Sequence, residues 1–399
     1  MSDPAGTADP AAAPDRRIAI LTTGRQDWGI LRSTALGLLA TPGVEVLVAA
    51  GGMHLSQRHG LSVHEIRADG VAVAAELPWL DPDADPPAQV QAARALEVVG
   101  AWLDRERPDA LVLVGDRLET ASAALAATLT RTPIVHLHGG EQSGGAFDDA
   151  LRHAITKLAH LHLVSHEEHA ARVRALGEDP ASIHVVGAPG LDNAVRSDLP
   201  NRSALEADLG IALDGPIIVV TVQPATLDPD PAAVVRPVLA AMNRVPGTYV
   251  ITLPNSDLGA ASIRDALQEA AAADDRRVAV DALGARRYWG LLRIADAMLG
   301  NSSSGLIEAP AFDLPAVDVG DRQQGRRREA NVLTVPATDE AVEQALRRAI
   351  DPSFRALVTA AHPPLVDGHA GTRTARIINA WRPQRPPRKA PILVRVDAT

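Results

Sequence analysis

The sequence contains no cysteine among its 399 residues. A chain without cysteine has no disulfide framework and no thiol nucleophile, which fits a reducing compartment. No apolar run approaches the length that spans a bilayer, so no transmembrane helix or membrane partner is expected. Residues 1–16 are rich in Ala, Pro and Asp and lack the basic start and apolar core of a signal peptide, and we expect a disordered tail there. The sequence therefore predicts a cytoplasmic protein.

Lysine is almost absent as well. Lys157 and Lys389 are the only two, so nearly all positive charge is arginine, and Lys157 is expected to have a specific role. The formal net charge of −10 argues against a nucleic-acid surface. An anionic ligand must then be held by a local cluster, for which arginine is well suited. Heavy use of Ala, Arg, Gly and Pro is typical of GC-rich coding and favours a bacterial source.

Short aliphatic runs alternate with helical periods along most of the chain. Such alternation predicts parallel sheets with helices on both faces. A polar stretch near residue 195 separates two series, so we expect a domain at 17–195, a second domain at 196–370, a helix at 371–381 that returns to the first, and a tail at 382–399. The predicted strands lie at 17–22, 44–50, 71–77, 110–114, 134–138 and 161–165, then at 217–222, 248–253, 278–280, 297–299, 315–319 and 332–335.

The most informative stretch follows the strand at 297–299. Gly300-Asn301 leads into Ser302, Ser303, Ser304 and Gly305, and then into a helical pattern, LIEAPAF. A small-residue turn before a helix leaves backbone N–H groups and the positive end of the helix dipole facing one way, which suits a phosphate. Helix capping is the alternative, but one serine is enough for a cap. Glu308 lies one turn further along and could accept hydrogen bonds from sugar hydroxyls.

Charged residues gather where other strands of the series end, which is where open α/β sheets bind ligands. The sequence places Arg25 and Asp27 after the first strand, His54 after the second, and Asp116 and Arg117 after the fourth. In the second domain Gln223, Asn255 and Arg322 follow strands in the same way. Asp148 opens a later helix. Capping and a solvated first turn are the alternatives for Asp116 and Asp148.

The segment HLHGGE, residues 136–141, offers a second possibility. His136 and His138 share one face if the strand continues to residue 138, and a His-x-His pair can bind a metal. No strict metal-binding spacing accompanies the pair, so we predict no metal. We expect His160 and His162 to be core or capping residues.

Seven segments occur along the chain in the order TTGRQDWGIL, GDRLETASAALAA, HLHGGEQSGGAFDDALRHAITK, VGAPGLD, TLPNSD, GNSSSGLIEAPAF and VGDRQQGR. Together they resemble the UDP-N-acetylglucosamine 2-epimerase family, and they are closest to its hydrolysing branch. The resemblance covers about residues 17–381. It implies a glycosyltransferase-B-like α/β fold, with two Rossmann-like doubly wound domains and the nucleotide sugar in a central cleft. It also implies a UDP-sugar substrate, no cofactor and a homodimer.

The resemblance implies an elimination reaction. A base takes the proton at C2 of the sugar while UDP leaves C1, and water or UDP then adds to the 2-acetamidoglucal with inversion at C2. This requires carboxylates near a cationic centre and donors on the diphosphate. By motif, Asp116 and Asp148 match the catalytic acids. The matching substrate-binding residues are Arg25, Asp27, His54, Arg117, Asn255, Ser302, Ser303, Ser304, Gly305, Glu308 and Arg322.

Two departures from the family pattern concern the chemistry. Where the family often has a third carboxylate, this chain has His138, with Glu141 slightly later. Gln223 stands where the family has a histidine, and glutamine cannot carry a proton. We include His138, Glu141 and Gln223 among the catalytic candidates. The alternatives are a non-hydrolysing epimerase, a glycosyltransferase of the same fold, and a nucleotide-sugar-binding protein without turnover.

Overall fold

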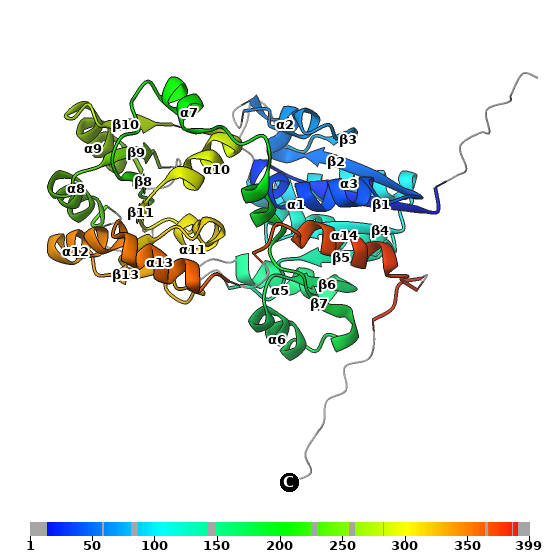
Figure 1. Cartoon of the computed structure of the whole chain (residues 1–399). Helices are drawn as coiled ribbons and strands as arrows, with labels where there is room; N and C mark the ends of the chain where they lie inside the picture. Colours follow the sequence, from blue (N-terminus) through cyan, green and yellow to red (C-terminus); the bar gives the residue numbers. More distant parts are fainter. Residues whose placement is uncertain are drawn as a thin grey trace, which may run out of the picture. The chain divides into compact units, whose positions relative to one another are not determined.

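The computed structural model describes residues 14–389, apart from 58–59, 81–86, 143–147, 225–229, 231, 255–259, 282, 364–365 and 385. The described chain forms two compact units (Figure 1). Unit 1 contains residues 14–141, 148–190 and 370–389, and unit 2 contains Gln142 and residues 191–369. Each unit is a parallel sheet covered by helices. A 3₁₀ turn, η4 (Pro189–Val195), lies at the division.

Within its described residues, unit 1 has a seven-stranded parallel sheet in the order β3-β2-β1-β4-β5-β6-β7. The chain order reverses between β1 and β4, and in such sheets the ligand site lies at the carboxyl ends beside this point. The strands are β1 (Arg16–Thr22), β2 (Val44–Gly51), β3 (Val73–Leu77), β4 (Ala110–Val114), β5 (Ile134–Leu137), β6 (Leu161–Val164) and β7 (Ile183–Val185).

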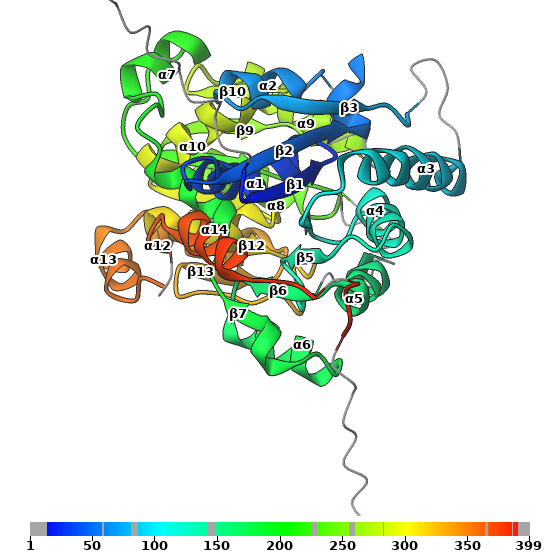
Figure 2. The same ribbon diagram turned by 90° about the vertical axis from the view of Figure 1, so that its right-hand side faces the viewer.

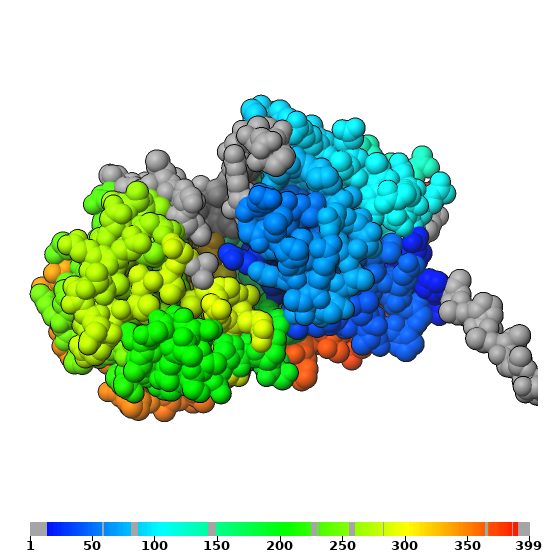
Figure 3. Space-filling model, turned by 90° about the horizontal axis from the view of Figure 1, so that it is seen from above, coloured from blue at the N-terminus to red at the C-terminus, as the bar shows by residue number. Residues whose placement is uncertain are grey.

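Successive residues of a strand point to opposite faces of the sheet, and in these strands the residues on both faces are apolar. Helices therefore cover both faces of the sheet. Ile18 and Ile20 of β1 pack with α1 and α14, whereas Ala19 and Leu21 pack towards α3, α4 and α5. Figure 2 shows α3, α4 and α5 following one another along the sheet, and Figure 3 shows the outer surface of unit 1 on the side of α2 and α3. The helices are α1 (Arg25–Leu39), α2 (Val63–Ala68), α3 (Ala88–Glu106), α4 (Leu118–Leu129), α5 (Asp148–Leu158), α6 (Glu167–Ala175) and α14 (Ala370–Ala380), with 3₁₀ turns η1 (Gly52–Leu55) and η3 (Pro180–Ser182).

The last helix of the described chain, α14, belongs to unit 1 and packs on α1. Arg16 at the start of β1 fixes its end, since Nη1 donates to the carbonyls of Ile378 at 2.8 Å and Asn379 at 2.9 Å. The last carbonyls of a helix have no partner within the helix, so this buried arginine satisfies groups that would otherwise be orphaned.

Within its described residues, unit 2 also has a parallel sheet, with six strands in the order β10-β9-β8-β11-β12-β13. Val220 and Ile218 of β8 face α8, α9 and α12, whereas Ile217 and Val219 face α7 and α10. The elements are α7 (Arg202–Leu209), β8 (Ile217–Thr221), α8 (Val235–Arg244), β9 (Thr248–Thr252), α9 (Ala260–Ala272), β10 (Arg277–Val280), α10 (Gly284–Ile294), β11 (Ala297–Gly300), α11 (Ser304–Ile307), η5 (Ala309–Phe312), β12 (Ala316–Val319), β13 (Val332–Val335), α12 (Asp339–Ala349) and α13 (Pro352–Ala360).

The structure corrects the sequence interpretation at three places. Strand β5 ends at Leu137, so His138 is outside it. The helix predicted from LIEAPAF is one α-helical turn, α11, followed by the 3₁₀ turn η5, because Pro310 lacks the N–H that a continuing helix needs. Helices α2, α6, α7 and α13 and the edge strand β7 were not predicted.

Candidate active site

A histidine of the neighbouring strand β5 is hydrogen-bonded to the loop after β4. His136 is fully buried, and its Nε2 donates to the Gly115 carbonyl at 2.8 Å. Because that nitrogen is the donor, Nδ1 accepts from the Thr156 hydroxyl of α5 at 3.2 Å. Burial lowers the pKa of His136 to about 3 and keeps the ring neutral. His136 therefore positions the residue next to Gly115, which is Asp116.

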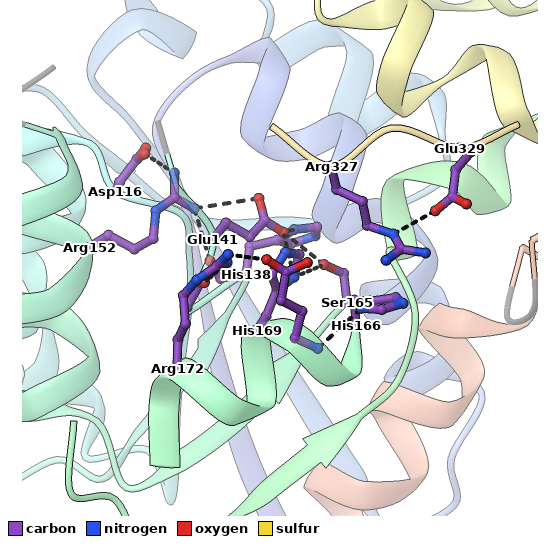
Figure 4. A network of polar contacts seen from close by, with 12 residues as sticks. Asp116, His138, Glu141, Arg152, Ser165, His166, His169, Arg172, Arg327 and Glu329 are labelled. Carbon is purple, nitrogen blue, oxygen red and sulfur yellow. Dashed lines mark hydrogen bonds and ion pairs between the residues drawn. The ribbon is translucent and has the colours of Figure 1, made fainter. Parts of the chain in front are cut away.

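Asp116 forms an ion pair with Arg152, an arginine that was not among the predicted site residues. The guanidinium of Arg152 on α5 has only 6% of its side chain exposed, and its Nη2 donates to Asp116 Oδ2. Its Nη1 donates to the His138 carbonyl at 2.9 Å and lies 3.6 Å from Glu141 Oε2. Arg152 thus connects carboxylates at the carboxyl ends of two neighbouring strands (Figure 4).

His138 and Glu141 form a hydrogen-bonded pair after β5. His138 adopts a left-handed backbone conformation with φ of 62° and lies outside β5. The strand does not continue to residue 138, so the condition for a shared face with His136 is not met. His138 Nδ1 lies 2.6 Å from Glu141 Oε1, and its Nε2 is buried without a hydrogen bond to the described residues. A non-glycine residue at positive φ is strained, and such strain concentrates at functional sites.

Glu141 is surrounded by positive and hydrogen-bonding groups. Burial alone would raise the pKa of its carboxyl, but His138, Arg152 and His169 together lower the pKa well below its usual range. Ser165, directly after β6, also donates to Oε1 at 2.8 Å. The Glu141 carboxylate is therefore negatively charged and held in one orientation.

The loop that carries His138 and Glu141 is pressed against α6. A Cβ added to Gly140, whose φ is 76°, would come within 2.3 Å of the His169 carbonyl, so only glycine fits there. Arg172 of α6 donates to the Gly140 carbonyl at 3.0 Å. The His138 amide donates to the Leu163 carbonyl of β6 at 3.2 Å. These contacts fix the position of the Glu141 backbone.

The loop after β1 exposes one arginine and buries the acid beside it. Asp27 Oδ2 accepts from the Thr23 amide at 3.0 Å and from its hydroxyl at 2.5 Å, and burial raises the pKa of this carboxyl. Asp27 therefore shapes the turn from within. Arg25 is exposed at the start of the 15-residue helix α1. It adds a guanidinium to a helix N-terminus, a combination that suits an anion.

His54 and Arg117 differ in their availability. His54 is fully buried, and its two ring nitrogens contact the hydroxyls of Thr22 at 2.8 Å and Ser62 at 2.9 Å. Burial lowers its pKa to about 4, so His54 is a neutral support below the β2 loop. Arg117 precedes α4, is one-third exposed, and donates to Glu119 at 3.2 Å.

In unit 2 the serine turn starts from a glycine that cannot be replaced. A Cβ on Gly300 would lie 2.0 Å from the Thr221 carbonyl of β8, so the two strands approach closely only because this residue is glycine. Ser302 Oγ accepts from the Ser304 amide at 3.3 Å. Ser303 is half-buried, and its hydroxyl makes no hydrogen bond to the described residues. Ser303 is the N-cap residue of α11 and makes no side-chain capping hydrogen bond, so its hydroxyl is available.

A fully buried asparagine joins this turn to the loop of Gln223. Asn301 Oδ1 accepts from the Gln223 amide at 2.7 Å, and its Nδ2 donates to the Gln223 carbonyl at 2.8 Å. The Asn301 carbonyl accepts from Arg322 Nη1 at 3.1 Å and Gln323 Nε2 at 2.8 Å. Residues from three strand ends are therefore fixed together, with an arginine among them.

Glu308 lies below the turn. Burial raises the pKa of its carboxyl, and its Oε2 is buried without a hydrogen bond to the described residues. Tyr288 of α10 lies 2.5 Å from the Ser304 hydroxyl, and burial together with Glu308 raises the pKa of this phenol. Gly305 is buried and its carbonyl accepts from Asn331 at 3.0 Å.

Two predicted site residues lie outside what the structure describes. Asp148 begins α5, but its side chain is not described, and Asn255 falls within 255–259. In the described part of the chain, no three His, Asp or Glu side chains gather in a way that could hold a metal, and no helix is long and apolar enough to cross a membrane. The sequence interpretation missed Arg152, Ser165, His169 and Asn301 as members of these clusters.

Both lysines contact one carboxylate away from these loops. Glu178, 5% exposed, lies 2.5 Å from the ammonium groups of Lys157 and Lys389 and 3.1 Å from His162 Nε2. Lys157 therefore takes part in an ion pair with Glu178, and a specific role for it stays a prediction. The expectation for two histidines is confirmed, because His162 is a core residue and His160 accepts from the Ile134 amide at 3.2 Å.

Comparison with known proteins identifies the family. The model of the UDP-N-acetylglucosamine 2-epimerase family matches residues 38–379. The chain belongs to this family. It is 34% identical to UDP-N,N′-diacetylbacillosamine 2-epimerase (hydrolyzing) of Legionella pneumophila over 84% of this chain and 89% of the relative. It is 31% identical to GDP/UDP-N,N′-diacetylbacillosamine 2-epimerase (hydrolyzing) of Campylobacter jejuni over 85% of this chain and 89% of the relative.

Solved structures of the family share the fold. The UDP-GlcNAc 2-epimerase of Neisseria meningitidis, solved with UDP-GlcNAc bound, has a TM-score of 0.78 at 14% identity and covers 92% of this chain and 100% of its own. The fold is therefore glycosyltransferase-B-like, with two Rossmann-like units, as the resemblance implied. Hydrolysing and other 2-epimerases both occur among the relatives.

Proposed function

We propose that this protein is a hydrolysing UDP-sugar 2-epimerase that converts UDP-N-acetylglucosamine to N-acetylmannosamine and UDP. Family membership supports the reaction class, and the names of the two relatives above support hydrolysis. The observation that carries the proposal is the Asp116–Arg152–Glu141 arrangement, in which one buried guanidinium contacts carboxylates from two adjacent strand ends.

In the first half of the reaction Asp116 removes the C2 proton while the bond from C1 to the UDP oxygen breaks. A double bond forms between C1 and C2, which gives 2-acetamidoglucal. Glu141 is fully ionised, so it is a poor base but a good stabiliser of positive charge developing at C1. We assign the proton transfer to Asp116 and not to His138, whose free Nε2 is covered by protein.

The leaving diphosphate needs positive donors. By motif, we assign this role to Arg25, Ser303 and Arg322. Glu308 would accept from the ribose, and Asn301 keeps the Gln223 loop and the serine turn in register. In the second half, water adds its hydroxyl to C1 while a proton is delivered to C2 from the opposite face. We assign that proton to Asp148, which matches the family's catalytic acids by motif.

The substrate is tested by incubating the full chain with UDP-N-acetylglucosamine, UDP-N,N′-diacetylbacillosamine and their GDP counterparts, and by following nucleotide release with phosphorus NMR. Free UDP together with N-acetylmannosamine supports the proposal. UDP-N-acetylmannosamine with little free UDP would make the protein a non-hydrolysing epimerase. Release from the diacetylated sugar alone would change the substrate and keep the chemistry. No release from any of the four contradicts the proposal.

Homodimer formation, also predicted, is measured by light scattering.

A further inference from the structure

Ser165 and His169 lie behind Glu141, on the side of β6 and α6. Ser165 Oγ is 2.8 Å from Glu141 Oε1 and 2.9 Å from His169 Nδ1, and His169 Nδ1 is 3.9 Å from the same carboxylate oxygen (Figure 4). The proposed reaction uses neither side chain for contact with substrate. They form a connected set with Glu141 and His138.

The directions of these hydrogen bonds follow from what each atom can do. An ionised carboxylate only accepts, so the single Ser165 hydroxyl proton goes to Glu141. Ser165 Oγ must then accept from His169, which places a proton on His169 Nδ1. His138 must also donate to Glu141 from Nδ1, which leaves the lone pair on Nε2. His169 therefore donates to Ser165, and Ser165 donates to Glu141 Oε1. His138 donates to the same carboxylate oxygen.

We infer that Ser165 and His169 are positioning residues for the epimerase reaction. They hold the Glu141 carboxylate in one orientation. In that orientation the carboxylate stabilises positive charge at C1 and fixes the tautomer of His138. Without the Ser165 hydroxyl, Oε1 loses one of its two donors and the carboxylate can turn towards Arg152, which lies 3.6 Å from Oε2. Without the His169 donor, the Ser165 hydroxyl is free to rotate away from Glu141.

The packing of the loop makes this set rigid. Gly140 contacts the His169 backbone so closely that no side chain fits between them, and Arg172 holds the Gly140 carbonyl. Consequently Glu141 and His169 cannot separate by a movement of the loop alone. Among the described residues, the groups that face Glu141 are His138 from the loop after β5, Arg152 from α5, Ser165 from the loop after β6, and His169 from α6.

The test uses the full chain and the UDP-sugar on which the wild type turns over. S165A and H169A should lower kcat by about 10- to 100-fold with KM unchanged, because each removes a hydrogen bond to, or in support of, a charged group. S165T keeps the hydroxyl, and H169N places an amide N–H where Nδ1 was, so both should restore most of the rate. S182A, which removes a hydroxyl donating to the Asp179 carbonyl, and H64Q on the exposed side of α2 are the matched controls.

A second readout does not depend on turnover. Nitrogen-15 NMR of histidine-labelled protein, assigned with H138Q, should show His138 protonated at Nδ1 in the wild type, S165T and H169N, and a mixture of tautomers in S165A. Wild-type kcat in S165A and H169A overturns the inference, and so does an equal loss in H169N and H169A.

This inference rests on the proposed function, and the two can fail separately. If the wild type releases no UDP from any sugar, the proposed function fails. The NMR spectra of the His138 tautomer then test the role of Ser165. An unchanged His138 signal in S165A then overturns the role of Ser165, whereas a change supports it.

Discussion

Arg152 of α5 donates to the Asp116 carboxylate while its other terminal nitrogen donates to the backbone of His138. One buried side chain therefore fixes both the acid after β4 and the loop after β5. The same helix also carries Thr156, whose hydroxyl bonds His136 of β5.

Replacing Arg152 by glutamine should nearly abolish activity and lower stability. Asp116 would lose the partner of a largely buried ion pair, and removing one member of such a pair costs about 3 kcal/mol. The melting temperature and kcat are measured for R152Q beside R174Q, which removes a mostly exposed pair with Glu167. An R152Q enzyme with wild-type kcat would contradict the role given to Arg152.

Asn301 should be more important for stability than its small size indicates. In N301A the amide and carbonyl of Gln223 both lose their partner, and unsatisfied backbone groups cost about 1–3 kcal/mol each. We expect a lower melting temperature and weaker UDP binding by calorimetry. The control is N243A, whose side chain is exposed and accepts from Arg277. Equal behaviour of the two variants would argue against a special role for Asn301.

The side chain of Gln223 can be changed without disturbing its hydrogen bonds to Asn301. Both of those hydrogen bonds join the Asn301 side chain to the backbone of Gln223. Q223H should introduce a group that titrates near pH 6.5 into the pH profile of kcat. Q223A should lower kcat without adding a titrating group to the pH profile. Identical pH profiles for wild type and Q223H would show that position 223 takes no part in the rate-limiting step.

Glu178 should contribute to stability in a pH-dependent way. Burial opposes its ionisation, but His162, Lys157 and Lys389 lower the pKa of the carboxyl to about 2, below its ordinary value of 4.5. A lowered folded-state pKa stabilises the protein above pH 4.5, and the contribution disappears as pH falls towards 2. The melting temperature of E178Q should therefore differ from wild type most at neutral pH and least near pH 2. E76Q, in an exposed pair with Arg67, should match wild type throughout.

Much of the fold could be predicted because buried parallel strands are continuous aliphatic runs, as in residues 17–22 and 110–114. Strand β7 could not, since a short edge strand that is only half-buried needs no such run. The cluster around Glu141 was only partly predicted. His138 and Glu141 stand in a glycine-rich motif, whereas Ser165 and His169 reach them through the packing of α6, whose sequence EEHAARVRA has little apolar pattern. Position after a strand was the one signal that could have indicated Ser165.

The central claim is that the protein breaks the C2–H bond of a UDP-sugar and rebuilds it from solvent. It is tested most directly by proton NMR of UDP-N-acetylglucosamine with the full chain in deuterated water, beside D116N. We expect free UDP and N-acetylmannosamine with deuterium at C2 for the wild type, and neither for D116N. UDP release with the C2 proton retained would contradict the elimination.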